Sequence, residues 1–87
     1  MAEKNTPAAR RLFELKCGPL KVDYLCGLYS VCYLFADVKE TAGLCIHKTG
    51  TGTTFEGACR DYLRQIRGET MVIRVPGCEW KEVEITG

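Results

Sequence analysis

Six cysteines in a chain of 87 residues restrict the fold more than any other feature of the sequence. In a secreted protein of this size, six cysteines are typical of a scaffold held by three disulfide bridges. Residues 1–16 lack the apolar segment of a signal peptide, which favours a reducing, cytoplasmic location. We therefore expect free thiols, several of them buried as small apolar side chains. The cysteines lie at positions 17, 26, 32, 45, 59 and 78.

Size and composition indicate one small globular domain. Hydrophobic residues make up 46% of the chain and charged residues 26%, as in ordinary folded proteins and unlike disordered segments. We expect a single domain over residues 1–87, with residues 1–5 disordered. The formal net charge of +1 argues against both a strongly basic nucleic-acid-binding protein and an acidic DNA mimic. No apolar run reaches the roughly 18 residues that cross a bilayer, so no membrane association is expected.

Two segments have the pattern of amphipathic helices. The first begins at Thr6-Pro7, where a hydroxyl can cap the helix and proline fits the first turn. It ends at Gly18-Pro19, because proline cannot continue a helix. The second begins after Thr53 or Thr54 and ends at Gly68. Its apolar positions recur at helical spacing and predict a stripe that packs on a sheet, formed by Phe55, Cys59, Tyr62, Leu63 and Ile66.

Four segments are expected to form strands. Residues 28–37 alternate in the manner of a strand rich in aromatic and β-branched side chains, although a helix over residues 23–42 fits the same positions. After a turn at residues 39–43, residues 44–48 alternate again and are expected to pair with the first strand as a hairpin. Residues 49–53 are predicted to be a flexible connector. Two further strands, residues 70–75 and 79–85, flank a Pro76-Gly77 corner.

These elements predict an α+β fold in the order α-β-β-α-β-β. One long helix would pack on an antiparallel four-stranded sheet, together with a short N-terminal helix.

The chemical motifs in the chain are weak. Gly50-Thr51-Gly52 precedes a helix, as phosphate loops do, but the remaining residues of a nucleotide-binding fingerprint are absent, which favours a plain loop. Cys45 and His47 share one face of a strand, and a metal site would need further ligands from Cys17, Cys26 or Cys32. A nucleophilic site would need a cysteine, His47 and one of Asp23, Asp37 or Asp61. The sequence spacing of these residues does not match a known metal-binding or nucleophilic motif, so we expect no enzyme activity, no metal and no cofactor.

The C-terminal hairpin offers a candidate contact surface. A three-residue connection with a bulge would shift the strand pairing by one residue and gather Met71, Ile73, Val75, Val83 and Ile85 on the buried face. Val72, Arg74 and Trp80 would then share the other face with Glu82 and Glu84. Tryptophan and arginine are enriched in binding hot spots, so Val72, Arg74 and Trp80 are candidate partner-binding residues. The alternative is that Leu12 and Phe13 of the first helix cover Trp80, which would make it a core residue.

A second candidate surface lies on the predicted second helix. Arg60, Arg64 and Arg67 recur on one helix face, opposite the apolar stripe. They are candidate partner-binding residues that could contact phosphate groups. The simpler interpretation is a solvated helix face, aided by an ion pair between Glu56 and Arg60.

A small chain without a catalytic motif is expected to act by binding. We expect a non-enzymatic protein-binding module that inhibits or modulates a larger protein or protein complex, of the kind that bacterial viruses encode as anti-CRISPR or other anti-defence inhibitors, in which case it acts in the host cytoplasm. The alternative is a small nucleic-acid-binding module that uses Arg60, Arg64 and Arg67. A third possibility is a metal or redox protein built on cysteine and histidine. Open sheet edges could also pair two copies into a homodimer.

Overall fold

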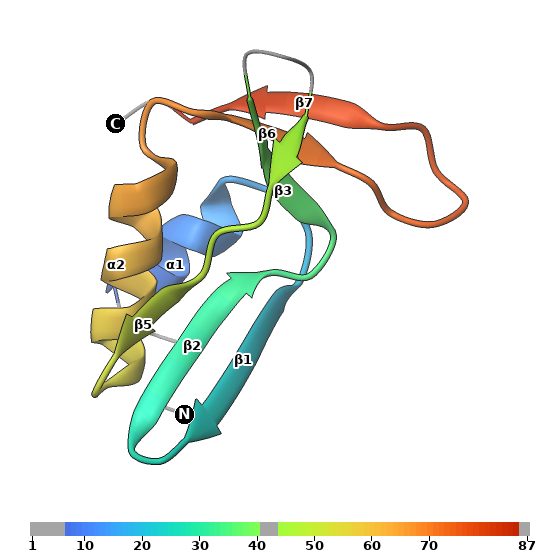
Figure 1. The fold of residues 1–87 in the computed structure, drawn as a ribbon. Coiled ribbons are helices and arrows are strands. Elements are labelled where there is room, and N and C mark those ends of the chain that lie inside the picture. The colour runs from blue at the N-terminus through green and yellow to red at the C-terminus, as the bar shows by residue number, and fades with distance from the viewer. Residues whose placement is uncertain (1–6, 41–43, 86–87) are drawn as a thin grey trace.

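The computed structural model describes residues 7–40 and 44–85, and the expected disorder of residues 1–5 therefore lies outside the described residues (Figure 1). Two helices and seven strands follow one another along this part of the chain. They are α1 (Pro7–Glu14), β1 (Leu20–Leu25), β2 (Leu28–Tyr33), β3 (Ala36–Lys39), β4 (Cys45–Ile46), β5 (Gly50–Gly52), α2 (Phe55–Ile66), β6 (Thr70–Ile73) and β7 (Lys81–Glu84). Neither described helix has the length and apolar composition to cross a bilayer.

The strands form two antiparallel sheets, with the orders β1-β2-β5 and β4-β3-β6-β7. The α+β class is confirmed, whereas the single four-stranded sheet is replaced by these two sheets. The segment expected as one strand over residues 28–37 is strand and not helix, but it divides at Leu34-Phe35 into β2 and β3. The Leu34 amide donates a hydrogen bond to Pro19 O, just before β1 (2.9 Å). The carbonyl oxygen of the following residue, Phe35, accepts one from the Arg74 amide, just after β6 (2.7 Å). The chain therefore leaves one sheet and enters the other within two residues.

Strand β1 was not expected from the sequence. It forms a hairpin with β2 in which Leu25 lies opposite Leu28. The two residues between them, Cys26 and Gly27, have φ angles of 54° and 78°. Two successive positive φ values are typical of the type I′ turn that suits a tight hairpin, where asparagine or aspartate is usual at the first position. Because cysteine occupies that position, the sequence did not indicate a hairpin turn there.

The expected connector over residues 49–53 contains a strand that packs closely on α2. Gly50 of β5 lies opposite Val31 of β2. A Cβ atom on Gly50 would lie 2.5 Å from Tyr62 Cβ and would collide with the carbonyl oxygen of Ala58. The glycines of this segment therefore permit close contact between strand and helix, and the prediction of a flexible connector is wrong. The expected strand over residues 44–48 is limited to β4, which pairs with β3.

Helix α2 forms where its cap and stripe predict it. Thr54 is the N-cap, and its hydroxyl accepts a hydrogen bond from the Gly57 amide (2.9 Å). Cys59, Tyr62 and Ile66 are buried, whereas Phe55 and Leu63 are only partly buried. Helix α1 starts at Pro7 and packs against α2 through small residues and a leucine, namely Ala8, Ala9 and Leu12. Phe13, which was considered together with Leu12 as a cover for Trp80, is 48% exposed.

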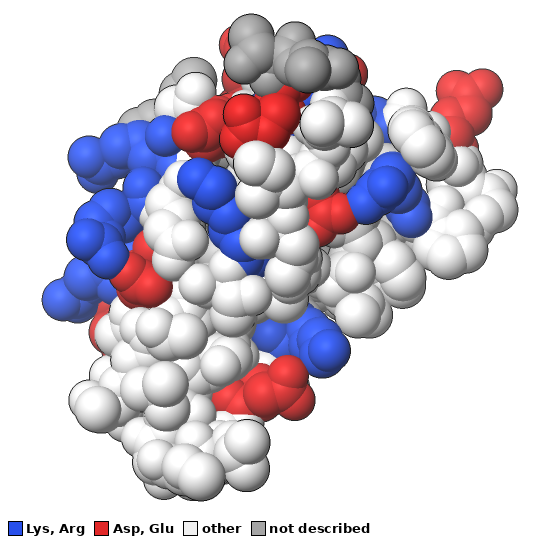
Figure 2. Space-filling model, viewed as in Figure 1, with Lys and Arg blue, Asp and Glu red and all other residues white. Residues whose placement is uncertain are grey.

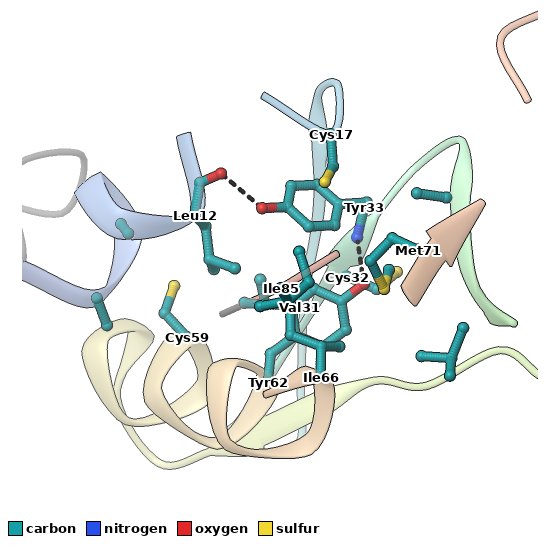
Figure 3. Packing of buried hydrophobic residues seen from close by; sticks show 14 of the residues in the cluster. Leu12, Cys17, Val31, Cys32, Tyr33, Cys59, Tyr62, Ile66, Met71 and Ile85 are labelled. Atoms are coloured by element: carbon teal, nitrogen blue, oxygen red, sulfur yellow. Dashed lines mark hydrogen bonds between the residues drawn. The ribbon is translucent and has the colours of Figure 1, made fainter. Parts of the chain in front are cut away.

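Two tyrosines organise the core between α1, β2 and α2 (Figure 3). The Tyr33 hydroxyl donates to Leu12 O (2.5 Å), and the Tyr33 amide donates to the Tyr62 hydroxyl (3.1 Å). Burial raises the pKa of Tyr62 to about 12. The two hydroxyls thus satisfy a helix carbonyl and a strand amide that would otherwise be buried without a partner.

All six cysteines are free, as expected from the sequence. Cys59 is fully buried, also as expected, and burial raises the pKa of its thiol to about 11. Burial also raises the thiol pKa of Cys17 and Cys32. These three cysteines pack in the core as small apolar side chains, whereas Cys26, Cys45 and Cys78 are exposed.

Candidate protein-binding surface

The register of β6 and β7 determines which side chains reach the surface of the four-stranded sheet. Met71 lies opposite Val83, and Ile73 lies opposite Lys81. This is the shifted register that burial was expected to select, and it places Met71, Ile73 and Ile85 in the core, with Val75 and Val83 packed against it. The opposite face of the hairpin carries Glu82 and Glu84, whereas Lys81 shares the face of Ile73 and is exposed.

Trp80 lies outside the core, beside Arg74. The indole is 70% exposed, and the guanidinium carbon of Arg74 is 5.6 Å from the ring centre. The expected stacking of these two residues is confirmed, and the alternative in which α1 covers Trp80 is wrong. Asp37 of β3 forms an ion pair with Arg74. This carboxylate holds the guanidinium in place beneath the indole.

Val72 does not belong to the exposed surface, contrary to expectation. It is only 6% exposed and lies between Asp37 of β3 and Glu82 of β7 in the sheet. Lys39 of β3 forms an ion pair with Glu82 (2.9 Å), and this pair crosses β6 because β6 lies between the two strands. With so little exposed area, Val72 offers little surface to a partner.

Residues from the crossover between the sheets complete the surface around Trp80. A shallow hollow of about 370 Å³ is lined by Leu34, Phe35, Asp37, Arg74 and Trp80, which together we call the Trp80 patch. Leu34 is about half exposed although it is apolar. Sequence reasoning missed Leu34 and Phe35 as surface residues and considered Asp37 only as a carboxylate beside His47, because it placed all three within one continuous strand.

His47 borders the same sheet face. Its Nδ1 lies 3.0 Å from Asp37 Oδ1, and its Nε2 lies 3.3 Å from Thr49 Oγ1. Of the carboxylates considered for a nucleophilic site, Asp37 is the one that contacts His47, and no thiol is among the hydrogen-bonding partners of His47 in the described residues. Within residues 7–40 and 44–85, no three metal-ligating side chains come together. Cys17 and Cys32 are buried in the core, and Cys26 lies in the hairpin turn.

The arginines of α2 lie along an open groove with acidic neighbours. Arg60 pairs with Glu56 (2.8 Å), Arg64 pairs with Asp61, and Arg67 is exposed at the end of the helix. Figure 2 shows the basic side chains gathered over α2, with acidic side chains beside them. A hydrogen bond from the Thr51 amide, together with Arg64, lowers the pKa of Asp61. These ion pairs match the interpretation of α2 as a solvated helix face.

The β1–β2 hairpin exposes a further apolar region that sequence reasoning missed. The Tyr24 and Tyr29 rings lie 4.6 Å apart, centre to centre, in a tilted arrangement, yet Tyr24 remains largely exposed. Figure 2 shows this end of the molecule largely free of charged side chains. Several large apolar side chains of the hairpin are exposed, namely Val22, Tyr24, Leu25 and Leu28.

Comparison with known proteins adds no functional assignment. No protein-family model matches the chain, and neither the curated proteins nor the solved structures contain a significant match.

Proposed function

We propose that this chain is a small, non-enzymatic protein-binding module that contacts its partner through the Trp80 patch. The observation that supports this proposal best is the position of Trp80, which is 70% exposed yet stacked on an arginine that is itself paired with Asp37. An exposed tryptophan held by neighbouring side chains loses little conformational freedom on binding. Tryptophan and arginine are both enriched in binding hot spots.

The hollow beside the indole favours a specific kind of contact. Leu34 and Phe35 supply apolar walls, while Arg74 supplies donors at the rim. A partner that inserts an apolar side chain beside Trp80 and directs an acceptor to Arg74 would satisfy both features. We therefore expect a folded protein surface as the partner.

The role of that binding is inhibition or modulation of a larger partner, in the cytoplasm. The narrower hypothesis of an anti-CRISPR-like inhibitor from a bacterial virus rests on chain size, near-neutral charge and the lack of a catalytic motif. It predicts that expression of the chain in a bacterium with active CRISPR immunity restores plaque formation by a targeted phage. Unchanged plaque counts at confirmed expression would contradict it.

Affinity capture with matched variants tests the proposed surface. Leu44 provides the control, because it is 68% exposed and is not among the residues of the Trp80 patch. A protein retained by the wild type and by Leu44→Ala, but bound at least about 30-fold more weakly by Trp80→Ala, would support the Trp80 patch. If Trp80→Ala retained every captured protein as well as the wild type does, the Trp80 patch would not be the binding surface.

Nucleic-acid binding by Arg60, Arg64 and Arg67 makes a different prediction about salt. If the partner were duplex DNA, the logarithm of affinity would fall by about 0.9 per logarithmic unit of salt for each phosphate contacted. Two of the three arginines already pair with carboxylates of α2, so this alternative requires those ion pairs to open.

A further inference from the structure

The two outer strands of the three-stranded sheet differ in how their free backbone groups are used. On β5, the Thr51 amide donates to Asp61 Oδ2 (3.0 Å). Just before β5, Thr49 O accepts a hydrogen bond from Gln65 Nε2 (2.9 Å). Side chains of α2 therefore close this edge, and a second strand cannot pair there without displacing them.

Strand β1 has an open edge. Leu25 and Leu28 flank the two-residue turn and form a hydrogen-bonded pair, so alternate residues, Asp23 and Lys21, also direct their backbone groups toward β2. The hydrogen bond from the Leu34 amide to Pro19 O continues this alternation.

The residues in between, Leu20, Val22 and Tyr24, therefore direct their amides and carbonyls away from β2. No other strand of the described chain pairs with this edge (Figure 1). A row of unpaired backbone groups on a six-residue strand is a template for pairing with another strand.

The side chains of β1 select a particular partner strand. In an antiparallel pair, two residues that face each other must both direct their backbone groups toward the partner or both away from it. A second copy of β1 can therefore pair around Lys21, Val22 or Asp23, but not around a point between two residues. Pairing around Lys21 places two lysines opposite each other, and pairing around Asp23 does the same with two carboxylates.

Pairing around Val22 alone places Lys21 opposite Asp23 of the second copy, twice. None of the ion pairs among the described residues uses Lys21 or Asp23. The remaining residues also match, because Val22 faces Val22 and Leu20 faces Tyr24. The charges of β1 thus specify one register.

We propose that two copies of this chain form a symmetric dimer through antiparallel pairing of their β1 strands, with the twofold axis at Val22. Three backbone-paired positions would supply six hydrogen bonds, and the two three-stranded sheets would join into one sheet of six strands. The apolar side chains of Val22 and Tyr24, both exposed in the single chain, would lie against those of the second copy.

The four-stranded sheet has two edge strands, β4 and β7, and neither offers this complementarity. Strand β4 has only two residues, Cys45 and Ile46, and neither is charged. In β7, pairing around Val83 would place Glu82 opposite Glu84, and pairing around Glu82 would bring two glutamates together. The β1 edge is therefore the one that fits a second copy. Because one strand pair buries little area, we expect a dissociation constant on the order of 10 to 100 µM.

Analytical ultracentrifugation of the reduced protein up to about 1 mM tests the dimer directly, because dimer formation depends on concentration. The mass should rise from 9.7 kDa toward twice that value. A chain that stays monomeric over this range would overturn the proposal.

Charge variants test the register. Lys21→Asp and Asp23→Lys should each weaken self-association at least about tenfold, because each replaces two attractions by two repulsions. The double variant Lys21→Asp/Asp23→Lys should dimerise like the wild type. A mixture of the two single variants should form a heterodimer, since every facing pair is then of opposite charge. Failure of both the double variant and the mixture to associate would exclude this register.

A backbone variant separates strand pairing from other contacts. Val22→Pro removes an amide that points away from β2, so the β1–β2 hairpin should persist while the dimer is lost. Val22→Thr keeps a β-branched side chain and the amide, and should dimerise normally. Dimerisation by a folded Val22→Pro variant would contradict the proposal. Trp80→Ala should leave self-association unchanged, so the outcome is independent of the proposed function.

Discussion

The outer strands β5 and β1 border the same three-stranded sheet, yet they are built for opposite surroundings. β5 contacts α2 through its glycines, and Asp61 of the helix accepts a hydrogen bond from its outer edge. β1 has five exposed residues out of six and no strand beyond it in the described chain. The contrast shows that the two neighbours of β2 differ in their surroundings: β5 packs on α2, whereas β1 is exposed. One side holds the core together, and the other is available for contacts with another molecule.

The largest effect is expected for Gly50→Ala on the closed side. A Cβ atom there would overlap Tyr62 Cβ and the Ala58 carbonyl, and backbone cannot move aside as a flexible side chain can. The free energy of unfolding should fall by more than about 3 kcal/mol, measured by urea denaturation. Thr51→Ala, at the exposed position between the two glycines, is the control and should cost less than about 1 kcal/mol. Similar stability of the two variants would disprove the tight contact between β5 and α2.

A smaller loss is expected for Tyr62→Phe. The substitution keeps the ring but removes the hydroxyl that accepts a hydrogen bond from the Tyr33 amide (3.1 Å). An unsatisfied buried amide should lower the free energy of unfolding by about 1 to 3 kcal/mol. Tyr24→Phe on the open side, where the ring is exposed, should have almost no effect. Equal losses in the free energy of unfolding for Tyr62→Phe and Tyr24→Phe would contradict the difference between the buried α2 side and the exposed β1 side of β2.

The edge cap at Asp61 should contribute about 1 kcal/mol, and the contribution should depend on pH. The pKa of Asp61 is lowered in the folded chain from its ordinary value of 3.8. The stabilisation is therefore present above that ordinary value and is lost as the pH falls through the folded pKa. Asp61→Asn should reduce the stability at pH 7 and flatten its decline in acid. An unchanged acid profile would mean that the Thr51–Asp61 hydrogen bond does not stabilise the fold.

The smallest effect on folding is expected at the tip of the open side. Leu25→Ser should change the free energy of unfolding by no more than about 0.5 kcal/mol, because Leu25 is largely exposed in the single chain. A thermal melt at low protein concentration provides the measurement. A loss as large as that of Tyr62→Phe would show that the hairpin tip is buried in solution.

Local patterns predicted the helices but not the division into two sheets. The Thr54 cap and the helical spacing of Cys59, Tyr62 and Ile66 are signals within one segment, and they identified α2 correctly. Strand β1 alternates between apolar Leu20, Val22 and Tyr24 and charged Lys21 and Asp23, but this short alternation was not used as a strand signal, and the structure leaves five of its six residues exposed. The crossover at Leu34-Phe35 is determined by pairing with distant strands, and the local alternation continues through it unchanged.

The Trp80 patch was partly predictable for the same reason. Burial of apolar residues on β6 and β7 determined the register, and the register placed Trp80 beside Arg74. The contribution of Asp37 depends on pairing between β3 and β6, which are far apart in the sequence. Val72 shares a face with Glu82 as predicted, but its burial was missed because β6 lies between β3 and β7, and β3 is far from it in the sequence.

The contact between α1 and α2 determines the order in which the chain can complete its fold during synthesis. The Ala8 amide donates to Glu56 Oε1 (3.0 Å), across 48 positions of sequence. Helix α1 has only eight residues, too few to be stable alone. At typical translation rates, Glu56 is added roughly 2 to 10 s after Ala8. Helix α1 must therefore remain without its packing partner until α2 has been synthesised, although it precedes α2 in the chain.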